Sequence, residues 1–302
     1  MNERDQVLES VGKTQRAVDR MDAALARQII KAYGDARVAL IGELESAFAR
    51  LGDDPTAAQV RGLMSQRSLI LAIERRIDTL MSIINETIQE TVSGVTSRTW
   101  LGISAEIEIL AAAVGVEQVA GLSVDALLEL TIAPAVEQVA GLSAATKATI
   151  TSALRSQLAQ GARLDEITRV VFGKGKDTGI FQRGLVSARR MAHRAISEAE
   201  NTARTAYLEN AAQQIDGLQR QAVAKIDSKT SKTCLRAHGQ IVGVDKPFEL
   251  VGDMRLAPRV QVPPFHWGPC RTTVTGYLAR FEQNSSLTTA QMRREAQELL
   301  AG

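Results

Sequence analysis

Apolar residues recur at three- and four-residue steps along the first third of the chain, with polar residues between them. From Met21 to Leu51 these positions form one stripe, which predicts a helix with a single buried face. The segment LGDDP (51–55) ends that helix, because a Gly follows the last periodic residue and a Pro lies just beyond it. In a second helix, apolar residues lie seven apart at Leu63, Ile70, Ile77 and Ile84, and Ile73 and Leu80 occupy the intervening seam position. This heptad-like spacing predicts an antiparallel helical hairpin or a stalk, or else a helix inside a bundle.

The helical pattern changes at Gly94, where we expect a break before a third helical stretch near Trp100–Ala113. Beyond it, the octapeptide VEQVAGLS occurs twice, at Val116–Ser123 and at Val136–Ser143. Two copies are too few for a solenoid. Each copy ends in a Ser that suits a helix N-cap, so the repeat predicts two similar helix–turn units with no chemistry implied.

The second half of the chain passes from helical periodicity to short β-like runs. We expect two helices around Gly161 and a long helix from about Arg183 to Ala212. Residues 221–227 and 239–245 mix β-branched residues with Gly and Asp, and 270–278 is a third β-like run. The sequence therefore predicts a mainly α protein with a small C-terminal α+β module and an elongated helical N-terminal region. The expected domains are 1–148, which is helical, 149–282, and a helical tail at 283–302.

Composition indicates a folded chain and excludes some classes of protein. Of the 302 residues, 45% are hydrophobic and only 4% aromatic, which favours long helices packed by aliphatic side chains. We expect no membrane span, because no apolar run approaches the ~20 residues that one needs. The first ten residues, MNERDQVLES, lack the pattern of a secretory signal. With two cysteines, we expect no disulfide framework and synthesis in a reducing cytoplasm.

The net charge of +2 conceals an asymmetry between the two halves. Residues 151–302 hold 22 of the 36 Lys and Arg but only 14 of the 34 Asp and Glu. The basic second half either meets an anionic partner or is a basic surface without one. On the long helix, the candidates for contacts with nucleic-acid phosphates are Arg189, Arg190 and Arg194, with His193 between them. A solvated basic face is the alternative.

Four of the five Cys and His residues of the chain fall within 37 positions, at Cys234, His238, His266 and Cys270. Their arrangement is C-x3-H and, 27 residues later, H-x3-C. Two thiolates and two imidazoles would fill the tetrahedral shell of a structural zinc ion, so these four residues are a candidate zinc site. Alternatively, the neighbouring prolines shape a loop whose Phe265 and Trp267 fill the core, or one Cys acts as a nucleophile.

The order of motifs along the second half is more specific than any single motif. The motifs are LRSQLAQGARLDEITRVVF (154–172), ISEAENTARTAYLENA (196–211), DSKTSKTCLRAHG (227–239) and PPFHWGPCRT (263–272). In this order they resemble the phage head morphogenesis family, the Mu F-like minor head proteins of tailed bacteriophages. The resemblance covers roughly residues 150–280 and implies that residues 149–282 are the head morphogenesis domain.

The family's signature residues, besides the Cys and His set, correspond here to Asp227, Thr230, Ser231, Gly239, Pro263, Pro264 and Arg271. The short polar side chains among them can bond nearby backbone N–H groups and fix a turn. Gly239 permits a backbone geometry that other residues resist. Arg271 is expected to pair with Asp227 or with a phosphate. We expect the segment near residue 265 to fold back onto the turn near residue 235 in one compact module.

The resemblance implies a minor head protein that lies inside the capsid near the portal and is made in the bacterial host's cytoplasm. Its implied roles are head assembly and genome packaging or DNA ejection, without catalytic turnover. The expected partners are the portal protein, a coat or scaffolding protein, and packaged DNA bound without sequence preference; a homo-oligomer is a further option. The expected cofactor is at most one structural zinc. The alternatives are a metal-dependent hydrolase or nuclease, and a zinc-stabilised helical interaction module.

Overall fold

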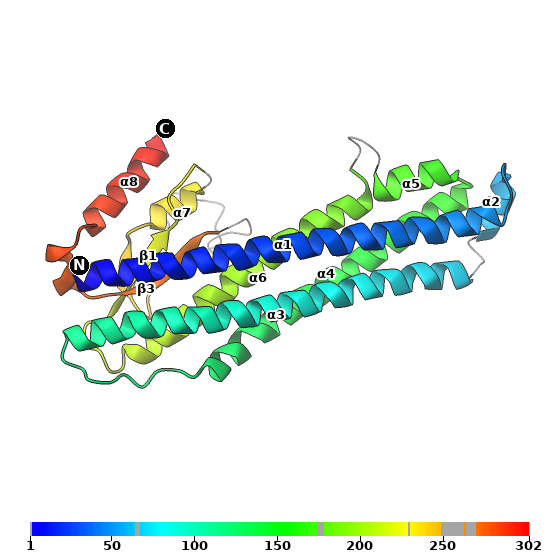
Figure 1. The fold of residues 1–302 in the computed structure, drawn as a ribbon. Helices are drawn as coiled ribbons and strands as arrows, with labels where there is room; N and C mark the ends of the chain where they lie inside the picture. Colours follow the sequence, from blue (N-terminus) through cyan, green and yellow to red (C-terminus); the bar gives the residue numbers. More distant parts are fainter. Residues whose placement is uncertain are drawn as a thin grey trace. The chain divides into compact units, whose positions relative to one another are not determined.

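The computed structural model describes residues 2–63, 67–173, 178–228, 230–248, 263 and 270–301. Within them the chain is mainly helical with a small antiparallel sheet near the C-terminus, which confirms the predicted fold class (Figure 1). The helices are α1 (Glu3–Ala49), α2 (Ala57–Leu63), α3 (Arg67–Ala113), α4 (Val124–Gln160), α5 (Leu164–Phe172), α6 (Ile180–Ala211), α7 (Lys232–Ala237), the 3-10 helix η1 (Ala279–Asn284) and α8 (Thr289–Ala301). The strands are β1 (Gln219–Ala224), β2 (Ile241–Gly243) and β3 (Thr272–Tyr277). None of the described helices carries an apolar stretch long enough to cross a membrane.

The chain divides into two compact units, each assembled from segments that are distant in sequence. The first unit comprises Met1–Ala23, Glu90–Pro134 and His193–Gly302, and the second comprises Ala24–Gln89 and Ala135–Ala192. The long helices α1, α3, α4 and α6 each contribute residues to both units. The division of the chain at residues 148 and 282 stays a prediction.

The apolar stripes predicted in the first half are buried. In α3 the seam residues are at most 1% exposed at Ile73, Ile77, Leu80 and Ile84. The break predicted at Gly94 is wrong, because α3 runs through this residue to Ala113. A glycine inside a helix costs only about 1 kcal/mol. The buried stripe continues on both sides of it, at Ile88, Val92 and Val95, and outweighs that cost.

The two copies of VEQVAGLS do not form similar units. The first copy, 116–123, lies outside any helix, whereas the second, 136–143, lies inside α4. Tertiary contacts hold the first copy in its conformation, since Trp100 Nε1–H donates to Leu122 O at 2.8 Å. Ser123 does cap the following helix, because its Oγ accepts from Ala126 N–H at 3.2 Å. The same role predicted for Ser143 is wrong, since this residue lies within α4.

The three strands form an antiparallel sheet with β1 in the centre, in the order β2-β1-β3. Gln221 of β1 faces both Ile241 of β2 and Thr275 of β3. The predicted strands at 221–227, 239–245 and 270–278 are confirmed with different bounds, because β1 begins and ends earlier than predicted and β2 and β3 are shorter. We call β1, α7, β2 and β3 with their connections, residues 219–248 and 270–278, the C-terminal module.

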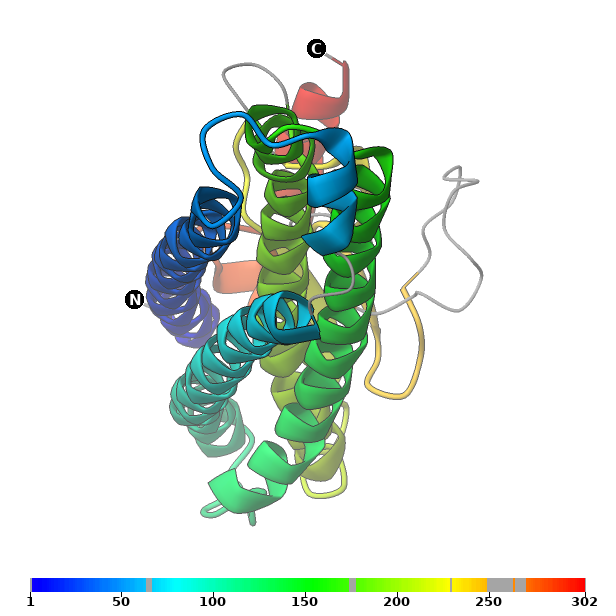
Figure 2. The ribbon, with the colours of Figure 1, turned by 90° about the vertical axis from the view of Figure 1, so that its right-hand side faces the viewer.

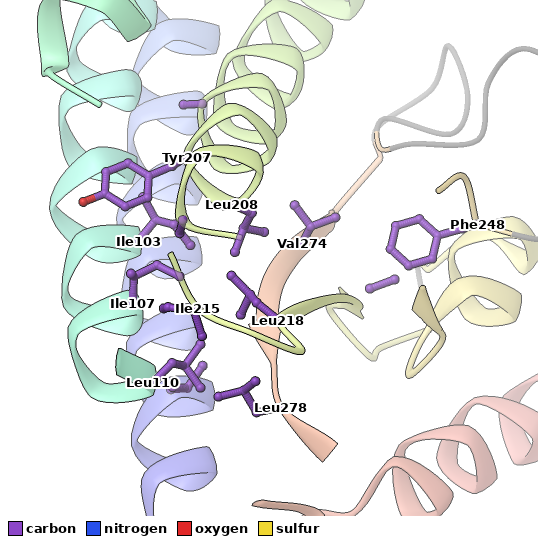
Figure 3. Close-up of a cluster of buried hydrophobic side chains, with 14 of the residues drawn as sticks. Ile103, Ile107, Leu110, Tyr207, Leu208, Ile215, Leu218, Phe248, Val274 and Leu278 are labelled. Carbon is purple, nitrogen blue, oxygen red and sulfur yellow. The ribbon is translucent and has the colours of Figure 1, made fainter. Parts of the chain in front are cut away.

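The C-terminal module packs on the helices of the first unit through one cluster of buried side chains (Figure 3). Ile103, Ile107 and Leu110 of α3 meet residues of α6 and β3, among them Leu208 and Val274. The approach of the sheet is close, because a Cβ added at Gly276 of β3 would lie 2.6 Å from the side chain of Leu110. Burying each large aliphatic side chain contributes roughly 1.5–3 kcal/mol, so α3 is an integral part of the core beneath the sheet.

In the second unit, segments of α1, α3, α4 and α6 run alongside one another (Figure 2). Tyr33 of α1 packs on Phe181 of α6, with ring centroids 5.0 Å apart, and Phe172 of α5 packs on the same ring at 5.6 Å. Burial raises the pKa of the Tyr33 hydroxyl to about 12. Ion pairs on the surface join α3 to its neighbours, including Arg76 with Glu43 at 3.0 Å.

Candidate functional site

The turn before α7 is built by the short polar signature residues. Asp227 N–H donates to Thr230 Oγ1 at 3.1 Å, and Thr230 N–H donates to Asp227 O at 3.0 Å. Ser231 is the N-cap of α7, because its Oγ accepts from Cys234 N–H at 3.2 Å. The side chains of Thr230 and Ser231 thus bond nearby backbone N–H groups as predicted, whereas Asp227 contributes its backbone to the turn.

Arg271 joins this turn to the start of β3. Its Nη1 and Nη2 donate to the two carboxylate oxygens of Asp227 at 2.6 and 2.5 Å, which confirms the intramolecular pairing. The hydrogen bonds and charge of Asp227 raise the pKa of the Arg271 guanidinium against the effect of its partial burial. Lys225 N–H donates to Arg271 O at 3.0 Å, so the backbone reinforces the same junction. Two segments 44 residues apart in sequence are thus held together by a bidentate ion pair.

The two cysteines meet beside this junction. Cys234 Sγ of α7 lies 3.6 Å from Cys270 Sγ, and the two residues are 1% and 3% exposed. The fold therefore brings residues 270 and 271 back onto the turn near residue 235, whereas residues 264–269 lie outside the described residues and the predicted fold-back of the segment near residue 265 stays a prediction. Two sulfur ligands of a tetrahedral zinc ion would lie roughly 3.8 Å apart, given Zn–S bonds of ~2.3 Å. The sulfur separation alone is compatible with a zinc site.

His238 has a different environment from the thiols. Its Nδ1 accepts from the backbone N–H of Ala224 at 3.0 Å. Burial, and secondarily the charge of Arg293, lower the pKa of the His238 ring to about 4, so the ring is neutral at pH 7. Within the part of the chain that the structure describes, no three His, Cys, Asp or Glu residues are grouped to hold a metal, Cys234, His238 and Cys270 included. His266 lies outside the described residues, and the four-residue zinc site stays a prediction.

Two more signature residues are described. Gly239 follows α7 with φ +76°, in the left-handed region that favours glycine. A Cβ at this position would lie 3.1 Å from side-chain carbons of both Met292 and Arg293 of α8. The predicted special geometry of Gly239 is therefore confirmed. Pro263 is buried, and Pro264 lies outside the described residues.

A buried ionic cluster beneath the sheet was missed by the sequence reasoning. Arg204 of α6 is fully buried, and its Nη1 donates to Glu106 of α3 at 3.1 and 2.9 Å and to Val274 O of β3 at 3.2 Å. Its Nε also lies 3.6 Å from Glu200 Oε1. Thr275 Oγ1 donates to Glu106 Oε2 at 2.9 Å. Although burial lowers the pKa of Arg204, the charges of the two glutamates outweigh this effect and raise it, so the guanidinium stays charged. The available signal was two charged residues four positions apart, Glu200 and Arg204, inside the apolar stripe of α6.

A cavity of ≈ 1170 Å³ lies beside His238, between α7, β2 and α8. Its lining carries the cations Arg236, Lys246 and Arg293 and, among the described residues, no carboxylate. Lys246 is paired with Asp245 at its rim, at 2.9 Å. This basic cavity was also missed, because its cations come from three separate segments. No periodic pattern in the sequence marks it.

The basic residues predicted on the long helix are placed in two different environments. Arg189 and Arg190 are exposed on the part of α6 that belongs to the second unit. Arg194 belongs to the first unit and pairs with Glu198 at 2.5 Å, with its side chain 19% exposed. His193 Nδ1 lies 2.7 Å from Asp22 Oδ2 of α1. Contact with nucleic acid stays a prediction for all three arginines, and the exposed pair is the one placed to make it.

Comparison of the chain with protein-family models, with curated proteins and with solved structures finds no match.

Proposed function

We propose that this protein is a minor head protein of a tailed bacteriophage, which acts inside the capsid near the portal. Its roles would be head assembly and genome packaging or DNA ejection, after synthesis in the host cytoplasm. The proposal is supported chiefly by one observation. Residues of the two most specific family-like segments, 227–239 and 263–272, contact each other through Asp227–Arg271 and Cys234–Cys270. The last two of the four motifs thus belong to one structural module.

An architectural role without turnover fits the way in which the polar groups of the module are used. Both carboxylate oxygens of Asp227 bond Arg271, and the hydroxyl of Ser231 caps a helix. His238 is neutral and bonded to the backbone, and the thiols are buried. These groups join chain segments to one another, which favours a scaffold for binding partners over a reactive centre.

Packaged DNA is one partner in this proposal. Two basic surfaces can meet phosphates: Arg189 and Arg190 on α6, and the cavity with Arg236 and Arg293. At neither surface does a described element have a shape suited to contacting base edges. We therefore expect DNA binding without sequence preference, which weakens as the salt concentration rises.

A virion protein is the second kind of partner, and the helices of the second unit offer it an apolar surface. A groove of ≈ 410 Å³ between α1 and α3 is lined by Ala32, Ala36 and Ile83 among others. Ile83 is 46% exposed, and Val38 on α1 is 73% exposed. We expect the portal, coat or scaffolding protein to contact the aliphatic lining of this groove.

The test of the proposed function is made on particles. In the phage that encodes this chain, we expect portal, terminase and coat genes beside its gene, and we expect mass spectrometry to find the protein in purified DNA-filled heads. Inactivating the gene should give particles with less DNA or lower infectivity, and supplying the gene in trans should restore them. Fully infectious particles that lack the protein would contradict the proposal.

DNA binding is tested separately, by fluorescence anisotropy with two labelled duplexes of unrelated sequence. We expect equal affinities for both duplexes, and weaker binding for either Arg189→Glu/Arg190→Glu or Arg236→Glu/Arg293→Glu. Lys13→Glu is the matched control, since Lys13 is exposed and lies on neither surface. If both double variants bind like the control, the basic surfaces are not the DNA contacts.

A further inference from the structure

The two cysteines of the chain are placed for a reaction with each other. Their sulfurs are 3.6 Å apart, and the residues lie in different elements, Cys234 in α7 and Cys270 just before β3. Sulfurs joined in a disulfide are about 2.05 Å apart. The sulfurs would therefore need to approach each other by roughly 1.5 Å to form a bond.

The backbone around both thiols is held by contacts that do not involve sulfur. Cys234 N–H donates to the capping hydroxyl of Ser231 at 3.2 Å. Cys270 O accepts from Ser197 Oγ of α6 at 3.2 Å, and the next residue, Arg271, forms its bidentate ion pair. The two segments are thus brought together before any covalent bond forms, and a bond between the sulfurs would join parts that already lie side by side.

We propose that Cys234 and Cys270 are an oxidative cross-linking site, which forms an intramolecular disulfide when the protein meets a hydroperoxide. One sulfur attacks the peroxide oxygen, the O–O bond breaks, and a sulfenic acid and one water form. The second sulfur attacks the sulfenic sulfur, the S–S bond forms, the S–O bond breaks, and a second water leaves. In sum, two thiols lose two electrons and two protons, and one hydrogen peroxide becomes two waters. This inference does not depend on the proposed function.

The burial of the thiols predicts how the site behaves. Oxidation requires a local opening of the module, so it is slower than that of an exposed thiol. Once formed, the disulfide closes a loop between residues 234 and 270 and lowers the conformational entropy of the unfolded chain. The oxidised protein should therefore unfold at a higher temperature than the reduced protein.

The test uses the full chain, purified with reductant, desalted and exposed to hydrogen peroxide. Tryptic digestion without reduction should yield TCLR (233–236) linked to VQVPPFHWGPCR (260–271), with two hydrogens fewer than the separate peptides. Added dithiothreitol should separate them. We expect the midpoint of thermal unfolding to rise by roughly 5–10 °C on oxidation and to return on reduction.

The variants Cys234→Ala and Cys270→Ala each leave a single thiol and should show neither the linked peptides nor the oxidant-dependent rise in midpoint. Three results would overturn the proposal: separate sulfinic acids at the two positions, disulfides between molecules, or one zinc per chain that protects the thiols until a chelator removes it. Should a variant fail to fold, the peptide map of the unaltered protein decides the question alone.

Discussion

Removing the charge of Arg204 should destabilise the first unit more than any other single polar change that we can identify. The side chain is fully buried and makes charge-assisted bonds to both carboxylate oxygens of Glu106. In Arg204→Met, Glu106 would keep the bond from Thr275 but lose its counter-charge in a site without solvent. Breaking a buried pair by removing one partner costs about 3–5 kcal/mol. Total stabilities are only about 5–15 kcal/mol, so the variant should unfold in mild urea.

Urea unfolding followed by circular dichroism measures this cost, and a double-mutant cycle isolates the pair. Glu106→Gln removes the other charge, and the double variant should lose at least 1 kcal/mol less than the sum of the two single variants, since partners in contact couple by ~0.5–3 kcal/mol. Arg189→Met, on the exposed face of the same helix, is the control and should change stability by less than about 0.5 kcal/mol. The reasoning is refuted if Arg204→Met costs under about 1 kcal/mol, or if the cycle shows no coupling.

Three further changes address the C-terminal module. Gly239→Ala should lower the free energy of unfolding by about 1–3 kcal/mol, because alanine is strained at φ +76°. Ser231→Ala, which only removes the cap of α7, should lower it by about 1 kcal/mol. Equal losses in the two variants would argue against strain at Gly239. Asp227→Asn should cost about 1 kcal/mol in urea unfolding, and that cost should shrink at high salt if the half-exposed pair with Arg271 is electrostatic. His238, with its folded pKa lowered to about 4, binds fewer protons folded than unfolded. The contribution of His238 to the free energy of unfolding is therefore fully present above pH ~6.5, and roughly 3 kcal/mol of it is lost as pH falls toward 4. His238→Asn should make the free energy of unfolding less dependent on pH in this range. An unchanged pH dependence would contradict the lowered pKa of His238.

The helices were predictable because their apolar positions carry a strong period. The stripe at Ile73, Ile77, Leu80 and Ile84 is buried as its spacing indicates. Where the prediction failed, tertiary contacts overrode local signals. Gly94 did not end α3, since the buried stripe continues beyond it. Two identical octapeptides took different conformations: the contact of Trp100 with Leu122 holds the first outside any helix, whereas the second lies in α4 with Val139 buried.

The candidate site was predictable in part, for a related reason. The turn residues around Asp227 have local chemistry that a sequence displays, and the pairing with Arg271 follows from opposite charge and motif order. The buried cluster of Glu106 and Arg204 pairs residues that are 98 apart in sequence. The charges inside the apolar stripe of α6 signal a buried polar site, but they do not identify Glu106 as the partner. The basic cavity beside His238 likewise exists only once α8 packs against α7. Such sites depend on tertiary structure that short-range patterns do not contain.

The dependence of the C-terminal module on α3 leads to a last prediction, about fragments. The core beneath the sheet needs Ile103, Ile107 and Leu110, and the buried Arg204 needs Glu106. These four residues of α3 lie outside residues 193–302. A fragment of residues 193–302 would expose the apolar side of its sheet and leave Arg204 without its main partner. We therefore expect the fragment to lack a cooperative thermal transition, whereas Ile107→Ala in the full chain should keep the transition and lose about 2–5 kcal/mol. A fragment that unfolds cooperatively, with well-dispersed amide resonances, would show that the module carries its own core and that α3 is only a neighbour.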